Sequence, residues 1–69
     1  MFKYPKPLSV ESGCKVMWRT YATRQEAEEA SKVAEKEARV RISQGYDFGY
    51  SSPGSIRTKE DGTYTVTCP

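Results

Sequence analysis

The chain carries few of the side chains that perform catalysis or hold metal ions. It has no histidine, and its two cysteines, Cys14 and Cys68, stand far apart in the sequence. A zinc site needs about four Cys or His ligands, and a serine or cysteine nucleophile usually needs a histidine base. Most acidic residues fall in one regularly charged stretch, which is typical of a solvated helix face. We therefore predict a protein that is not an enzyme, with no catalytic residues, no cofactor and no metal site.

Charge and hydropathy narrow the partners and the surroundings of the chain. The net charge of +2 is weaker than the clustered basic excess expected of a nucleic-acid binder. No apolar run approaches the ~20 residues that cross a bilayer. The opening residues MFKYPKPLSV also lack the apolar core of a signal peptide. We expect a cytoplasmic protein without a membrane partner.

The length allows one small domain over residues 1–69. Such a domain buries only about 60% of the surface that its unfolded chain exposes, so its core must be thin. Apolar residues make up 36% of the chain and charged residues 29%, a balance typical of a folded protein. Residues 1–7 contain two prolines and are predicted to be an extended N-terminal segment with room for mobility.

One long helix is the clearest element. Thr23 followed by Glu26 is a capping-box pattern. Neither Gly nor Pro occurs over 24–44, and Gly45 stands where a left-handed helix end is favoured. The sequence predicts a helix from Arg24 to about residue 44.

The helix has two apolar sides. Helical periodicity predicts a core stripe of small residues, which suits close packing on a sheet: Ala27, Ala30, Ala34, Ala38 and Ile42, with Ser31 beside them. Val33 and Val40 lie well over 100° away from this stripe. They are either ordinary exposed valines or a self-association seam of a homodimer.

Four strands are predicted around the helix. Residues 14–21 and 64–68 alternate in character, 55–59 lead into a Glu-Asp-Gly turn, and 8–11 can fold back through a Ser12-Gly13 turn. A three-residue turn with a left-handed Gly62 pairs Ile56 with Val66, whereas a two-residue turn would split the core across both faces.

The cysteines suggest how the strand that precedes the helix in the sequence pairs with the last strand of the chain. Antiparallel pairing of Cys14 with Cys68 also pairs Val16 with Val66, and it places Trp18 opposite Tyr64 on the core face. In this register both cysteines lie on the core face and are buried. We expect them to remain free thiols, because a disulfide is disfavoured in a reducing cytoplasm. The predicted fold class is α+β: an antiparallel sheet of three to four strands (β-α-β-β or ββαββ) with one long helix on one face.

The segment GYDFGYSSPGS, residues 45–55, connects the helix to the next strand. Its glycines and proline are explained by stopping the helix and entering the strand. Its aromatic rings either cap the core or form a partner-binding patch with neighbouring polar residues. The candidate partner surface is Tyr46, Asp47, Phe48, Tyr50, Ser51 and Ser52.

Basic residues form a third candidate surface. The register above places several of them, with Met17 and Tyr21, on the sheet face away from the helix, where they can stack bases and neutralise phosphates. The alternative is an ordinary solvated sheet. The basic set is Lys15, Arg19, Arg57 and Lys59 on strands, with Arg39 and Arg41 at the helix end.

A strand, a capped helix and a final hairpin, KEDGTYTVTCP, resemble in layout the small phage and prophage accessory proteins that inhibit CRISPR surveillance complexes. The resemblance implies a phage protein in the host-cell cytoplasm. It also implies host defence evasion, in which a host protein or ribonucleoprotein complex is inhibited through a protein interface. The alternatives are nucleic-acid binding through the basic face, or sequestration of a signalling nucleotide.

Overall fold

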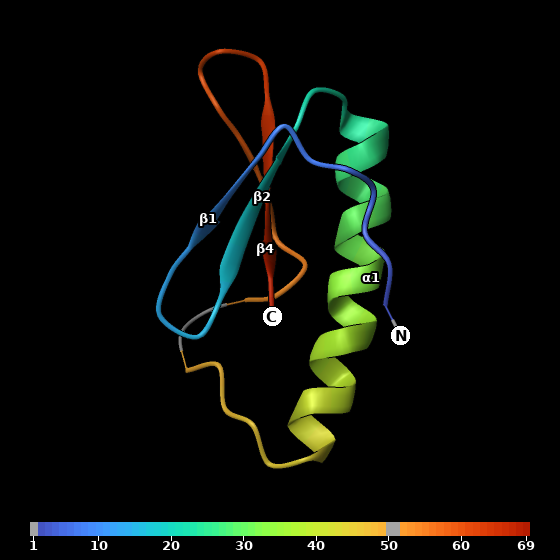
Figure 1. Cartoon of the computed structure of the whole chain (residues 1–69), viewed down its shortest axis with the longest axis vertical. Helices are drawn as coiled ribbons and strands as arrows, with labels where there is room; N and C mark the ends of the chain where they lie inside the picture. Colours follow the sequence, from blue (N-terminus) through green and yellow to red (C-terminus); the bar gives the residue numbers. More distant parts are fainter. Residues whose placement is uncertain (1, 50–51) are drawn as a thin grey trace.

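The computed structural model describes residues 2–49 and 52–69. They form a four-stranded antiparallel sheet with one helix against one face (Figure 1). The elements are β1 (Ser9–Ser12), β2 (Met17–Tyr21), α1 (Arg24–Ser43), β3 (Ile56–Thr58) and β4 (Tyr64–Cys68). The strand order is β1-β2-β4-β3, so one central strand precedes the helix in the sequence and the other is the last strand. The predicted α+β class is confirmed in its ββαββ form.

The ends of α1 follow the predicted caps. The Glu26 amide donates to the Thr23 hydroxyl at 3.3 Å, which satisfies one of the amides that no helical carbonyl can reach. At the other end Gln44 is the C-cap, and Gly45 follows with φ of +92°. A side chain is strained at that angle, so glycine ends the helix there.

The core lies between α1 and the sheet. The four predicted alanines of the stripe are all buried, and they let the helix lie close to β4. Three fully buried side chains of the sheet face them: Tyr21, Val66 and Cys68. The prediction that Ile42 belongs to this core is wrong, since its side chain is 58% exposed. Ile42 lies in the last turn of α1, which extends past the strands (Figure 1).

The turn between β1 and β2 differs from the prediction. The Gly13 amide donates to the Val16 carbonyl at 2.8 Å, so the turn residues are Cys14 and Lys15 rather than Ser12 and Gly13. Lys15 takes φ of +68°, a left-handed angle. Cys14 is therefore exposed in a turn, and its predicted place in a strand is wrong.

The register of β2 on β4 is also different. Met17 pairs with Cys68 and Arg19 with Val66, which is three residues away from the predicted pairing of Cys14 with Cys68. An odd shift exchanges the two faces of a strand. Tyr21 consequently points into the core, and Trp18 lies on the face away from the helix. The predicted core position of Trp18 is wrong.

The β3–β4 hairpin follows the predicted register. Ile56 pairs with Val66, and the Lys59 amide donates to the Thr63 carbonyl at 2.8 Å. Three residues remain in the turn, and the last of them, Gly62, has φ of +86°. The three-residue turn is confirmed.

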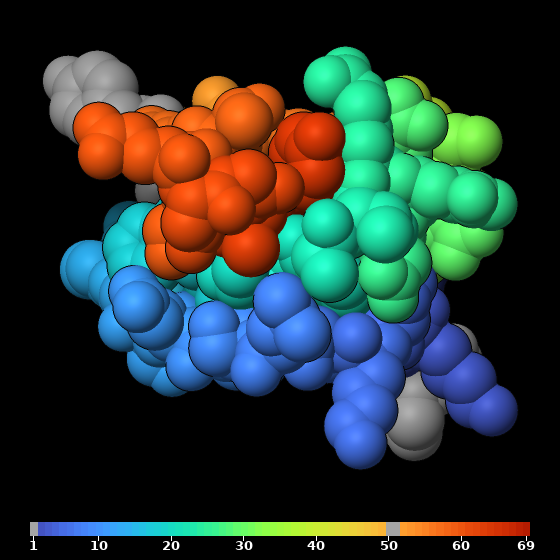
Figure 2. Space-filling model, turned by 90° about the horizontal axis from the view of Figure 1, so that it is seen from above, coloured from blue at the N-terminus to red at the C-terminus, as the bar shows by residue number. Residues whose placement is uncertain are grey.

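The N-terminal segment docks against the rest of the domain. Figure 2 shows the N-terminal residues and β1 along one flank, with the β3–β4 hairpin on the opposite flank. The Tyr4 hydroxyl donates to the Glu37 carboxylate at 2.7 Å, and the Tyr21 hydroxyl donates to the Pro5 carbonyl at 2.9 Å. These bonds tie the segment to both α1 and β2.

Candidate binding face of the sheet

The sheet face opposite α1, called the open face below, carries a hollow of about 280 Å³. No element among residues 2–49 and 52–69 packs over it. The hollow reaches across all four strands, because its lining comes from β1, β2, β4 and from β3 with the residue that follows it. The lining residues are Glu11, Trp18, Thr20, Arg57, Lys59, Thr65 and Thr67.

Trp18 supplies the aromatic surface of the hollow. Its side chain is half-buried, and part of it packs against the small cluster of Val16, Ala38 and Phe48. Gly13 lies beside the ring: a Cβ on Gly13 would stand 2.3 Å from the Cη2 and Cζ3 atoms of Trp18. Because glycine has no Cβ, the indole can rest against the backbone of the β1–β2 turn.

The polar lining of the hollow is arranged by strand pairing. Thr20 pairs with Thr65 and Trp18 with Thr67, so threonines form the floor between the aromatic ring and β3. Arg57 pairs with Thr65 and brings a guanidinium to the far side. Glu11 pairs with Trp18 and adds the one carboxylate of the lining.

The structure divides the six predicted basic residues among different places. Arg57 and Lys59 line the hollow. Lys15 lies in the β1–β2 turn, and Arg39 is exposed on α1. Arg19 lies on the helix side of β2, because the register differs from the predicted one, and its predicted place on the open face is wrong.

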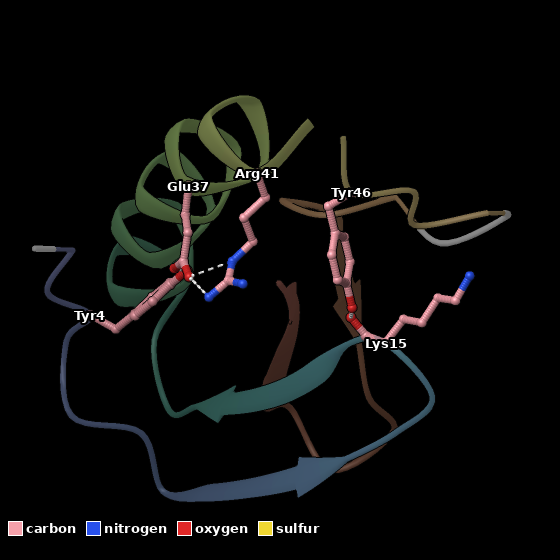
Figure 3. Close-up of polar contacts among 5 residues, drawn as sticks. All are labelled: Tyr4, Lys15, Glu37, Arg41 and Tyr46. Atoms are coloured by element: carbon pink, nitrogen blue, oxygen red, sulfur yellow. Dashed lines mark hydrogen bonds and ion pairs between the residues drawn. The ribbon is translucent and has the colours of Figure 1, made fainter. Parts of the chain in front are cut away.

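Arg19 and Arg41 belong to a cluster beneath the N-terminal segment. The Arg19 guanidinium lies 3.9 Å from the centroid of the Tyr4 ring, and its buried Nη1 has no hydrogen-bond partner in the described part of the chain. Glu37 accepts from Tyr4 and, at 3.0 Å, from Arg41 (Figure 3). Burial, together with the bond to Glu37, raises the pKa of Tyr4 far above its usual value.

The rings of the 45–55 loop are not equivalent. Tyr46 is 40% exposed, whereas Phe48 is 6% exposed and is buried in the cluster that touches Trp18. The two ring centroids are 4.6 Å apart. The Tyr46 hydroxyl lies 3.5 Å from the Lys15 carbonyl, so the loop reaches the β1–β2 turn (Figure 3). The prediction that Phe48 belongs to an exposed partner surface is therefore wrong.

The polar residues of that loop are exposed where the structure describes them. The Asp47 carboxylate accepts from the Gly49 amide at 2.9 Å, which is a local turn contact. Ser52 is exposed. The predictions for Tyr50 and Ser51 lie outside the described residues.

The Val33 and Val40 side of α1 is partly used by the protein itself. Val33 is half-buried and Val40 is 43% exposed. Glu37 lies between them on the same side of the helix, where it binds Tyr4 of the N-terminal segment. A self-association seam on this side would have to include that segment.

The two thiols are not joined. Cys14 is exposed and Cys68 is buried, so the expectation of two unbonded cysteines is confirmed and the predicted burial of Cys14 is wrong. Burial raises the pKa of the Cys68 thiol.

Comparisons with known proteins add no family to this geometry. A scan against protein-family models, a search of curated proteins and a search of solved structures each returned no match. Within residues 2–49 and 52–69, no three acidic, Cys or His side chains are grouped so that they could hold a metal ion. No helix in this part of the chain is long and apolar enough to cross a bilayer.

Proposed function

We propose that the chain is a non-enzymatic binding protein and that the open face is its contact surface. The observation that carries this proposal is the hollow with Trp18 on one side and Arg57 with Lys59 on the other. Trp and Arg are the side chains most enriched among residues that dominate binding energy. A solvated sheet does not need a tryptophan on a central strand, where Trp18 lies.

The other candidate surface is the 45–55 loop, for which one specific observation speaks. Tyr46 is 40% exposed, and its ring packs against the buried ring of Phe48. Tyrosine provides a large contact area at low entropic cost, which suits a protein interface. Inhibition of a host defence complex by a phage protein stays a prediction from the resemblance of layout.

A capture experiment tests the proposal and separates the two surfaces. The purified chain, the open-face variant Arg57→Gln/Lys59→Gln and the loop variant Tyr46→Ser are each immobilised and exposed to a bacterial lysate. The matched control Lys32→Gln/Lys36→Gln removes the same charge from exposed positions on α1. We expect the open-face variant alone to lose the captured material. Equal capture by the open-face variant and the wild type would refute the proposal, and loss with Tyr46→Ser would move the contact surface to the loop.

A further inference from the structure

We infer that the hollow binds single-stranded nucleic acid, with a base stacked on Trp18 and the adjacent phosphates on Arg57 and Lys59. This inference rests on the proposed function, since it names the partner of the same face. It shares Arg57 and Lys59 with the basic surface predicted from the sequence, but that surface combined them with Lys15, Arg19 and Tyr21, whereas the hollow combines them with Trp18.

The first support is the way in which Trp18 is held. Its ring rests against Gly13 on one side and packs on the cluster that contains Phe48, yet the side chain remains half-exposed in the hollow. A ring that is already fixed loses little conformational entropy when a base stacks on it. Stacking on aromatic rings is tolerant of sequence, because every base has a flat face.

The second support is the position of the cations. Arg57 and Lys59 are exposed, and among the described residues neither forms an ion pair. They lie on the β3 side of the hollow, two strands across from β2, which corresponds to about 10 Å between strand axes. Arg57 aligns with Thr20 rather than with Trp18, and Lys59 lies two residues further along, so both cations stand diagonally from the ring. The threonine hydroxyls between ring and cations can donate to sugar or phosphate oxygens.

The third support concerns the class of ligand. A duplex keeps its bases stacked on one another, so it cannot offer a base face to Trp18 in the centre of a sheet. A free nucleotide would contact only part of the lining at a time. The lining crosses all four strands and ends at the exposed Lys59 beyond β3, so a strand of several nucleotides can contact more of it. We therefore commit to a single strand as the occupant.

Glu11 provides a test, because its removal should change the affinity in opposite directions for a polyanion and for a basic partner. Its carboxylate lies in the same hollow as the two cations and opposes a polyanion. Glu11→Gln should therefore tighten the binding of a single strand by about twofold to threefold at low salt. A basic protein partner would respond in the opposite direction.

Trp18 makes the experiment direct, because it is the one tryptophan of the chain. Its fluorescence is followed during titration with a mixed-sequence single strand of about 15 nucleotides, with the matching duplex, and with mononucleotides and cyclic dinucleotides. We expect quenching by the single strand at low salt, and a dissociation constant that increases with salt because phosphate contacts release counterions.

Variants then assign the contacts, with binding measured by anisotropy of a labelled strand. Arg57→Gln/Lys59→Gln and Trp18→Leu should each weaken binding roughly tenfold. Lys32→Gln/Lys36→Gln is the matched control and should change affinity less than about twofold. If Trp18→Leu does not fold, the Arg57 and Lys59 double variant decides alone.

Each remaining outcome overturns the inference. Absence of quenching at low salt, binding of the duplex as tight as that of the single strand, or equally tight binding of a mononucleotide would each do so. If the capture experiment returns material that depends on the open face but survives nuclease and not protease, the proposed function stands and the nucleic-acid ligand is wrong.

Discussion

The two faces of the sheet use side chains of different size and polarity. Under α1 the sheet presents Tyr21, Val66 and Cys68, all with no exposed surface, against a row of alanines. On the open face the same strands present threonines, one tryptophan and two cations around a hollow. Neighbouring residues of one strand therefore lie in different surroundings: Val66 is buried under the helix, and Thr67 lines the hollow. The buried apolar contacts are concentrated on one face, and the other face is left uncovered by any element of the described residues.

The largest effect expected of a single substitution separates neighbours on β4. Val66→Ala removes fully buried methyl groups and should lower the free energy of unfolding by about 2 kcal/mol. Thr65→Ala on the open face should lower it by less than about 1 kcal/mol. Urea unfolding followed by circular dichroism measures both variants. Equal losses would abolish the contrast between the faces.

High pH should act through the covered face. Burial raises the pKa of Tyr21 to about 12, against about 10 in an unfolded chain. The unfolded state releases that proton first, so the contribution is complete below pH 10 and is lost as the pH rises toward 12. The slope from one such group reaches at most about 1.4 kcal/mol per pH unit.

Unfolding by urea at stepped pH values measures this loss. Tyr21→Phe removes one ionising group and should make the fall between pH 10 and 12 less steep, at the expense of the hydrogen bond to Pro5, while Tyr4 and Cys68, whose pKa values are also raised, continue to contribute. An unchanged fall in Tyr21→Phe would show that another group causes it.

A smaller effect is expected where the open face meets the β1–β2 turn. Gly13→Ala places a methyl group at 2.3 Å from two carbons of the Trp18 ring, so the ring must move. We expect a loss of about 1 kcal/mol, a shifted tryptophan emission maximum and weaker binding of single strands. Ser12→Ala is the control, because it changes an exposed neighbour of Gly13 without adding an atom near the ring. Unchanged emission in Gly13→Ala would mean that the ring is not held by the turn.

The smallest effect is expected at the end of α1. Ile42→Ser exchanges an exposed apolar side chain, so the free energy of unfolding should change by less than about 0.5 kcal/mol. A thermal unfolding scan is sufficient. A loss well above about 1 kcal/mol would return Ile42 to the core stripe that helical periodicity predicts.

The sequence contains enough information for the helix and for one hairpin. Thr23 and Gly45 are local signals, and the turn before β4 could be chosen because only one length keeps Ile56 and Val66 on one face. Both signals act over a few residues, where backbone geometry leaves little freedom.

The register of β2 could not be found in the same way. Its even-numbered residues include Trp18 and its odd-numbered residues include Tyr21, so alternation alone does not say which ring is buried. The decision depends on the Cys14-Lys15 turn, where a lysine takes a left-handed angle that sequence patterns assign to glycine or asparagine. The place of Trp18 on the open face follows from that turn, so the sequence predicted Arg57 and Lys59 on this face but not Trp18.

The unequal exposure of the two thiols has a practical consequence for oligomer measurements. Cys14 is accessible at a turn while Cys68 is buried, so air oxidation would join two molecules turn to turn through Cys14. A dimer seen without reductant would therefore say nothing about the Val33 and Val40 side of α1. The same accessibility is useful in reduced samples, because a maleimide dye would react at Cys14 alone and report from the turn that supports Trp18.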